Sequence, residues 1–191
     1  MQTNLAYQEE YREEIINGKV VMMASPVLNH MFISGNIFGI FRDYLKGKPC
    51  KPIPDGAALF LSETEQYIPD MMVVCDLEKM KTDGIHGAPD LVVEILSPST
   101  GQNDRSHKKD VYERSGVREY WIVSPSERSV EQYVLTDGQF VLRGVYYQFP
   151  DWMLKNMKEE ERAAVVHEFK CSLFDDLLIP VDEIFYGMIP A

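Results

Sequence analysis

The sequence predicts an α/β fold in which a mixed β-sheet carries a helix on each face. Short apolar segments of strand length alternate with turn-rich or charged segments, and longer segments with helical spacing divide them into the order helix, strands, helix, strands. The strict strand–helix alternation of a dinucleotide-binding fold is absent. With 191 residues, 45% hydrophobic and 26% charged, the chain can bury one sizeable core, so we expect a single domain over residues 1–191.

The first elements lie on either side of an Asn17-Gly18 turn. We expect a helical start before residue 13, a helix or strand end at 13–18 and a strand at 19–24. Apolar residues then recur at helical spacing from residue 27 to residue 46. This spacing predicts a long amphipathic helix whose apolar side contains Met31, Phe38, Phe41 and Leu45.

The remaining elements follow from apolar runs and turn residues. Strands are predicted at residues 57–61, 67–74 and 90–96, then a loop at 97–101, a second helix at 104–115 and a strand at 120–123. Segments 129–134 and 140–145 are typical of a hairpin around Thr136-Asp-Gly138. Residues 151–169 predict an exposed charged helix, and 172–179 are apolar enough to pack on the body. We therefore expect a core at about 11–145 and an extension at 146–191.

Composition excludes several classes of protein. No apolar run approaches the roughly 20 residues that span a bilayer, and the N-terminal residues lack the basic start and apolar stretch of a secretion signal. We therefore expect a cytoplasmic protein without a membrane segment. The three cysteines, Cys50, Cys75 and Cys171, are odd in number and have no CxxC spacing, which predicts buried free thiols rather than disulfides or structural zinc.

The net charge of −11 weighs against a general nucleic-acid binder, because an acidic chain repels a polyanion at long range. Any contact with DNA is therefore expected to be local. The excess of carboxylates suits hard divalent cations, which prefer oxygen ligands. The four histidines have no zinc-binding spacing, and neither a glycine-rich phosphate loop nor a GxSxG turn is present.

Glu94 is the most informative residue, because it interrupts the apolar segment 91–96. A buried carboxylate costs several kcal/mol unless a cation or a hydrogen-bond network compensates it. Strand alternation places Asp90 and Glu94 on one face, which suggests a shared cation. Pairing with an arginine, or a position at a sheet edge, is the alternative explanation.

Asp70 begins the apolar run that precedes the Glu94 segment. Neighbouring strands lie about 4.8 Å apart, so the two carboxylates can share one ion if the register permits. The preceding Pro69 leaves an ordinary turn as the alternative for Asp70.

Lys108 stands four residues after Asp104 and four before Tyr112, so the three share one helix face. A lysine facing Glu94 would orient a water molecule or stabilise charge on a phosphate. An exposed ion pair with Asp104 is the alternative, and the adjacent Lys109 is a second choice for the functional lysine.

Four motifs in this order carry a resemblance to a known family. They are Ile-Pro-Asp at 68–70, Ala-Pro-Asp-Leu-Val-Val-Glu-Ile-Leu-Ser-Pro-Ser at 88–99, Asp104 with Lys108 and Tyr112, and Gly-Val-Arg-Glu-Tyr-Trp-Ile-Val at 116–123. Over roughly residues 11–145 the chain resembles the Uma-type family of restriction-endonuclease-like proteins, within the PD-(D/E)xK nuclease superfamily. The resemblance implies a mixed sheet flanked by helices and a site that usually holds Mg²⁺.

The resemblance also implies roles for individual residues. By this resemblance, Asp70 and Glu94 are expected to be metal ligands, and Glu14 is expected to be an auxiliary acid that touches metal-bound water or a second ion. The superfamily pattern places its lysine at position 96, where this chain has leucine, so Lys108 supplies the amine instead. Asp90 becomes a neighbouring acid without an assigned role.

The function expected from this reasoning is phosphodiester hydrolysis by a homodimeric endonuclease that depends on Mg²⁺ or Mn²⁺ and acts on DNA. Two alternatives remain open. The first alternative is that the fold serves as a catalytically inactive binding or assembly module with a vestigial or structural acidic site, an interpretation that the acidic composition favours. The weaker alternative is a regulatory partner of another protein.

Overall fold

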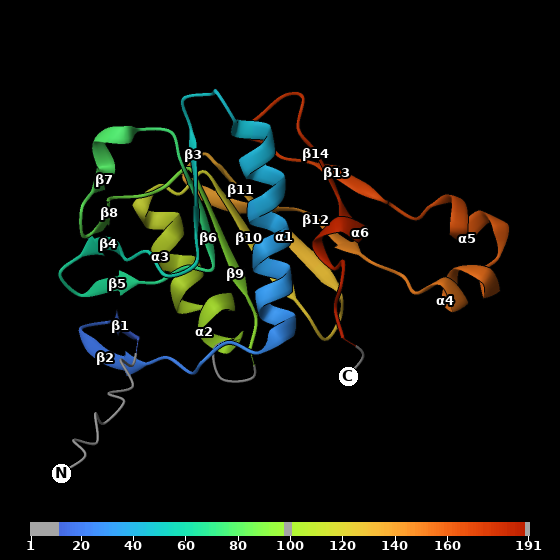
Figure 1. Cartoon of the computed structure of the whole chain (residues 1–191), viewed down its shortest axis with the longest axis horizontal. Helices are drawn as coiled ribbons and strands as arrows, with labels where there is room; N and C mark the ends of the chain where they lie inside the picture. Colours follow the sequence, from blue (N-terminus) through green and yellow to red (C-terminus); the bar gives the residue numbers. More distant parts are fainter. Residues whose placement is uncertain (1–11, 98–100, 190–191) are drawn as a thin grey trace, which may run out of the picture.

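The central sheet of the structure is mixed. A computed structural model describes residues 12–97 and 101–189 of the chain (Figure 1). In this sheet β9 and β10 run parallel, and the other neighbouring pairs run antiparallel. The strands, in order across the sheet, are β12 (Gln139–Tyr147), β11 (Ser129–Thr136), β10 (Glu119–Ser124), β9 (Leu91–Ile95), β6 (Met71–Val74) and β3 (Lys51–Pro54). The predicted mixed sheet is confirmed.

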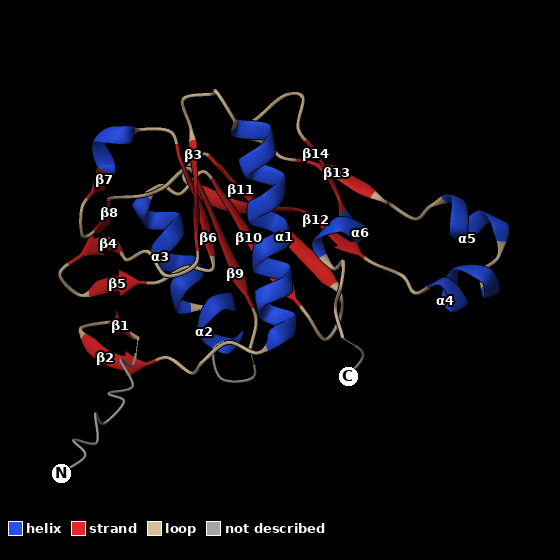
Figure 2. Cartoon of the chain, in the orientation of Figure 1, coloured by secondary structure: helices blue, strands red, loops and turns tan. Residues whose placement is uncertain are grey.

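A helix covers each face of this sheet, as predicted (Figure 2). Because side chains alternate along a strand, Val93 of β9 lies in the same buried core as Phe41 of α1 (Leu28–Leu45), whereas Val92 lies in the core that contains Val111 of α3 (His107–Ser115). The buried line of α1 repeats every four residues and differs in part from the prediction, because Met31 points away from it and is 55% exposed. This line consists of Ile33, Ile37, Phe41 and Leu45.

A second sheet begins with the hairpin of β1 (Glu13–Ile16) and β2 (Lys19–Met22). Asn17 and Gly18 have φ values of 51° and 74°, which a two-residue hairpin turn needs and which Asn-Gly tolerates. Residues 13–16 are therefore strand, and the helical start expected before them falls mainly in residues 1–11, outside the described residues. The other strands, in order from β1, are β5 (Glu65–Tyr67), β4 (Leu59–Ser62), β8 (Gly84–His86) and β7 (Met80–Lys81).

Two predicted elements are divided in the structure. The strand expected at 67–74 is two strands in different sheets, β5 and β6, because Pro69 has no N–H group for a ladder. The helix expected at 104–115 consists of α2 (Gly101–Arg105) and α3, because Ser106, with φ −123° and ψ −92°, leaves the helical region between them. Of the loop expected at 97–101, residues 98–100 lie outside the described part. Both breaks place candidate site residues at element ends.

The C-terminal extension packs against the face of the sheet that α1 covers. The helix predicted at 151–169 is instead α4 (Asp151–Asn156), α5 (Glu159–Ala163) and part of the pair β13 (Glu168–Lys170) and β14 (Leu178–Pro180), and Figure 1 shows α4 and α5 away from the central sheet. Leu177 and Ile179 are buried in the α1-side core. The short α6 (Val181–Ile184) follows. Among the described residues, no helix is long and apolar enough to cross a membrane.

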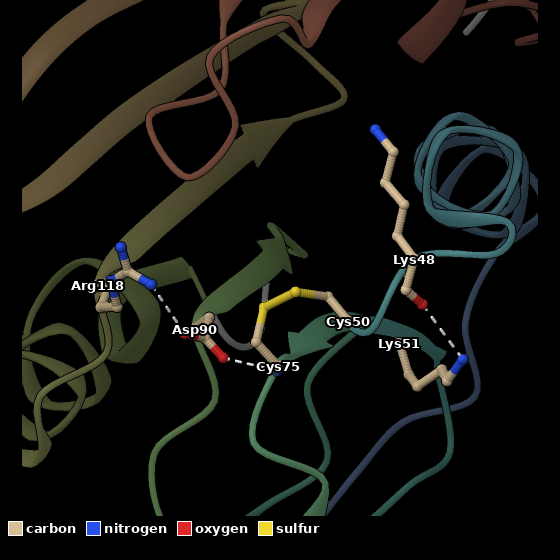
Figure 3. Close-up of a disulfide and its surroundings, with 6 residues drawn as sticks. All are labelled: Lys48, Cys50, Lys51, Cys75, Asp90 and Arg118. Carbon is tan, nitrogen blue, oxygen red and sulfur yellow. Dashed lines mark hydrogen bonds and ion pairs between the residues drawn. A yellow bond between two sulfur atoms is a disulfide. The ribbon is translucent and has the colours of Figure 1, made fainter.

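Cys50 and Cys75 form a disulfide at the edge of the central sheet (Figure 3). The antiparallel register places Lys51 of β3 opposite Val74 of β6, so the next residues outward, the two cysteines, face each other with Cα atoms 3.9 Å apart. The prediction of three free thiols is therefore wrong for this pair and right for Cys171, which is free and buried. Cysteine count and spacing carry no information about strand register. The unpredicted β3 contains Pro52 and Pro54, which an edge strand tolerates.

Candidate functional site

Glu94 lies near the end of β9 in the interior of the central sheet and is 4% exposed. Its Oε1 atom accepts hydrogen bonds from Lys108 Nζ at 3.2 Å and from Tyr112 Oη at 2.6 Å. Both donors come from α3, where residues four apart lie on one side of the helix. Glu94 therefore neither occupies a sheet edge nor depends on an arginine.

Lys108 is 2% exposed and lies among three carboxylates. Its Nζ atom is 2.9 Å from Glu14, 3.2 Å from Glu94 and 3.6 Å from Asp104. The alternative explanation for Lys108 is an exposed ion pair with Asp104. The pair is present, but it is buried and is part of a larger acidic group, which consists of Lys108 and the carboxylates of Glu14, Asp70, Glu94 and Asp104. Burial opposes the positive charge of Lys108, yet the carboxylates, Glu94 first, outweigh it and raise the pKa of the amine. Lys108 therefore stays protonated at neutral pH.

Glu14 links the N-terminal hairpin to this group. It is 2% exposed, and its Oε1 atom accepts hydrogen bonds from Lys108 Nζ at 2.9 Å and from the backbone N–H of Ile68 at 2.9 Å. The second bond joins β1 to the segment between β5 and β6. The structure thus brings Glu14, more than 50 residues away in the sequence, next to the segment that contains Asp70.

Asp70 lies in the connection before β6 and is nonetheless buried, with 7% exposed. Met71 lies opposite Val93, so the same register places Asp70 opposite Glu94. The Oδ2 atom of Asp70 accepts the backbone N–H of Ile95 at 2.6 Å. These contacts bring Asp70 and Glu94 to one end of two neighbouring strands, as the shared-ion prediction requires.

Two residues of α1 also contact Asp70. His30 Nε2 is 3.0 Å from Asp70 Oδ1, and Ser34 Oγ donates to the backbone oxygen of Asp70 at 3.0 Å. Burial lowers the pKa of His30, but the hydrogen bond and charge of Asp70 outweigh it, so the pKa is raised above its usual 6.5. The spacing of the histidines argues only against a zinc site, and no local pattern in the sequence links His30 to a residue 40 positions later.

The group carries more negative than positive charge. Burial raises the pKa of Glu94 well above its usual 4.5, and the charges of Asp104, Asp70 and Glu14 raise it further, while Lys108 acts in the opposite direction. Four carboxylates, each at most 7% exposed, thus surround or adjoin one buried lysine. An additional cation would stabilise this arrangement, because unpaired buried charge is costly.

The donor set fits a hard cation that keeps most of its water. Within residues 12–97 and 101–189, no group of three or more histidine, cysteine, aspartate or glutamate side chains is arranged to hold a metal ion. Asp70 and Glu94 instead offer two carboxylates on neighbouring strands. Mg²⁺ is commonly bound through one or two carboxylates, water and substrate phosphates rather than by a complete protein cage. The residues present therefore fit Mg²⁺ or Mn²⁺ better than zinc.

Two other candidates lie outside the group. Asp90 stands at the opposite end of β9, where it accepts the backbone N–H of Cys75 at 2.7 Å and pairs with Arg118 at 3.1 Å (Figure 3). The suggestion that Asp90 shares a cation with Glu94 is therefore wrong. The two residues share a strand face, but they are four positions apart and lie at opposite ends of β9. Lys109 lies over the ring of Tyr133, with Nζ 4.2 Å from the ring centroid.

Comparisons with known proteins agree with this fold. Residues 2–161 match the family model Uma2, described as "Putative restriction endonuclease". The uncharacterised protein slr1290 of Synechocystis sp. is 28% identical over 162 residues, which cover 83% of this chain and 80% of that protein. A crystal structure of "a putative nuclease belonging to DUF820" from Anabaena variabilis has a similar fold, with a TM-score of 0.68, 20% identity, and coverage of 92% of this chain and 90% of the other.

Proposed function

The chain belongs to the Uma2 family of restriction-endonuclease-like proteins, and from this premise we propose that it is a metal-dependent endonuclease that hydrolyses phosphodiester bonds in DNA. One observation carries the proposal: buried carboxylates outnumber the cationic side chains around Lys108. Their excess charge has a use if the site binds a divalent cation. The carboxylates are Glu14, Asp70, Glu94 and Asp104.

In this proposal Asp70 and Glu94 hold Mg²⁺ or Mn²⁺, and Glu14 is an auxiliary acid beside them. The cation supplies positive charge that polarises a phosphate and acidifies a water molecule. In the reaction, the water oxygen forms a bond to phosphorus while one phosphorus–oxygen ester bond breaks. The water proton passes to the released oxygen through solvent, which leaves one phosphate end and one hydroxyl end.

Lys108 acts in this scheme as a fixed positive charge. Its raised pKa excludes it as the base that removes a proton from water at neutral pH. Its ammonium group instead donates hydrogen bonds to Glu14 and Glu94 and reduces the repulsion between the carboxylates. The resulting role is to hold the ionised acids in position and to stabilise negative charge on the phosphate.

A plasmid-nicking assay tests the proposal. Purified protein is incubated with supercoiled DNA and Mg²⁺ or Mn²⁺ at low ionic strength, because a chain with net charge −11 binds DNA weakly when salt screens local contacts. Asp70→Asn and Glu94→Gln should each lower the cleavage rate about 100-fold or more. Glu119→Gln, which changes a buried carboxylate outside the group, is the matched control and should retain activity where it folds. Equal cleavage by all variants would indicate a contaminant.

The acidic composition also favours a second candidate function, an inactive binding or assembly module. Calorimetry with Mg²⁺ and Mn²⁺ separates the two candidates. A nuclease must show metal binding that Glu94→Gln weakens, whereas a module with a structural acidic group shows no heat that depends on Glu94. We also expect the nuclease to be a homodimer, since two copies present two sites to the two strands of a duplex.

A further inference from the structure

Helix α1 contacts the carboxylate of Asp70 through His30, a residue that has no role in the proposed reaction. His30, in the first turn of α1, has its Nε2 atom 3.0 Å from Asp70 Oδ1, and its side chain is 12% exposed. The other carboxylate oxygen, Oδ2, accepts the N–H of Ile95 at 2.6 Å. Each oxygen of this carboxylate therefore has its own partner, and the two partners come from different elements.

This double contact matters because of where Asp70 stands in the chain. It precedes β6, and Pro69 before it has no N–H group to join a ladder. The strand pairing that fixes Glu94 thus ends next to Asp70. The backbone N–H of Ile95 fixes one oxygen, and without His30 the carboxylate can still rotate about that single bond.

We infer that His30 is a positioning residue that sets the orientation of the Asp70 carboxylate for cation binding. The inference rests on the proposed function, in which Asp70 is a ligand. Partners that hydrogen-bond to metal ligands fix ligand orientation, and their loss typically lowers metal affinity or activity about 10–100-fold. His30 itself contacts neither the cation nor the phosphate in this role, but acts through Asp70.

A set of substitutions separates positioning from plain packing. His30→Gln keeps an N–H donor near the place of Nε2, whereas His30→Phe fills a similar volume without a donor. Ser34→Ala is the matched control, because Ser34 donates to the backbone oxygen of Asp70 and not to its carboxylate. Asp70→Asn removes the charge on which the proposed function depends.

The experiment measures Mn²⁺ affinity by calorimetry, and the Mn²⁺ concentration for half-maximal plasmid cleavage, on the full chain. His30→Phe should weaken Mn²⁺ binding about 10–100-fold, with cleavage at saturating Mn²⁺ much less affected. His30→Gln and Ser34→Ala should bind Mn²⁺ within a few-fold of wild type. Equal affinity of wild type and His30→Phe, together with lost binding in Asp70→Asn, would overturn the inference and leave the proposed function intact. Unchanged binding in Asp70→Asn would overturn both.

Discussion

Two buried glutamates on neighbouring strands of the central sheet have opposite surroundings. Glu94 of β9 lies among other carboxylates beside Lys108, on the side of α3. Glu119 of β10 lies on the side of α1 and accepts hydrogen bonds from uncharged groups. These donors are Trp121 Nε1, Gln132 Nε2, Cys171 Sγ, and the backbone N–H and Oγ of Ser172.

The comparison shows that burial of a carboxylate does not identify a functional residue. Glu119 is fully buried, yet neutral donors solvate its charge, and through Ser172 and Cys171 it ties the C-terminal extension to the sheet. Burial raises the pKa of Glu94 most, and the charges of the neighbouring carboxylates raise it further despite Lys108, so its ionised form is destabilised. The first arrangement stabilises the fold, whereas the second gains stability from an added cation.

The largest expected difference is in the stability of matched glutamine variants. Glu119→Gln should lower the free energy of unfolding by about 3–5 kcal/mol, because it removes the charge and places an amide N–H₂ against donors. Glu94→Gln should cost less than Glu119→Gln, since the amide oxygen can still accept from Lys108 and Tyr112 and the lost charge relieves repulsion between carboxylates. Urea denaturation in EDTA measures both. Similar losses in the two variants would show that Glu94 is as structural as Glu119.

The same pair shows what the sequence can reveal. Glu94 interrupts an apolar run, and this pattern predicts a site residue, whereas Glu119 stands just before Tyr-Trp-Ile-Val, where no local pattern marks it. Strand alternation and helical spacing predicted the central sheet and the helix on each face, because both depend on local periodicity. They also predicted that Lys108 faces Glu94, since four-residue spacing sets one helix face.

The parts that the sequence did not reveal depend on contacts between distant segments. Asp90 shares a strand face with Glu94, but alternation does not say which end of the strand a site occupies. The His30 contact with Asp70 and the Cys50–Cys75 disulfide both require the register or packing of elements at least 25 residues apart. No periodicity within one segment contains that information.

Reduction of the disulfide should have a smaller effect on the free energy of unfolding. It should leave the difference between the two glutamine variants unchanged. Opening a link between cysteines 25 residues apart should cost about 3 kcal/mol, because the unfolded chain regains conformational freedom. Urea denaturation with and without dithiothreitol measures this cost, and the double variant Cys50→Ser with Cys75→Ser is the control that dithiothreitol should not affect. The difference between Glu94→Gln and Glu119→Gln should persist under reduction, since the hydrogen bonds described for the two glutamates join them to other residues than Cys50 and Cys75. Its disappearance would show that the sheet edge controls both sites.

The smallest expected effect is the part of the pH dependence of stability that Glu94 contributes. Because its pKa is raised above 4.5 in the folded protein, the folded state holds the proton more tightly than the unfolded state. The resulting stability is present below pH 4.5 and is lost as the pH rises toward the folded pKa. Wild type should therefore lose stability relative to Glu94→Gln as the pH rises through this window in EDTA.

This subtraction removes most of the contribution of His30, whose raised pKa gives a change of the same sign above pH 6.5. Saturating Mn²⁺ should abolish the decline in wild type, because a bound cation stabilises the ionised carboxylate that high pH produces. A decline that Mn²⁺ leaves unchanged would mean that repulsion among the buried acids has no link to cation binding. Glu94 and Glu119 would then differ only in how well their surroundings stabilise a buried charge, and the difference would say nothing about a metal site.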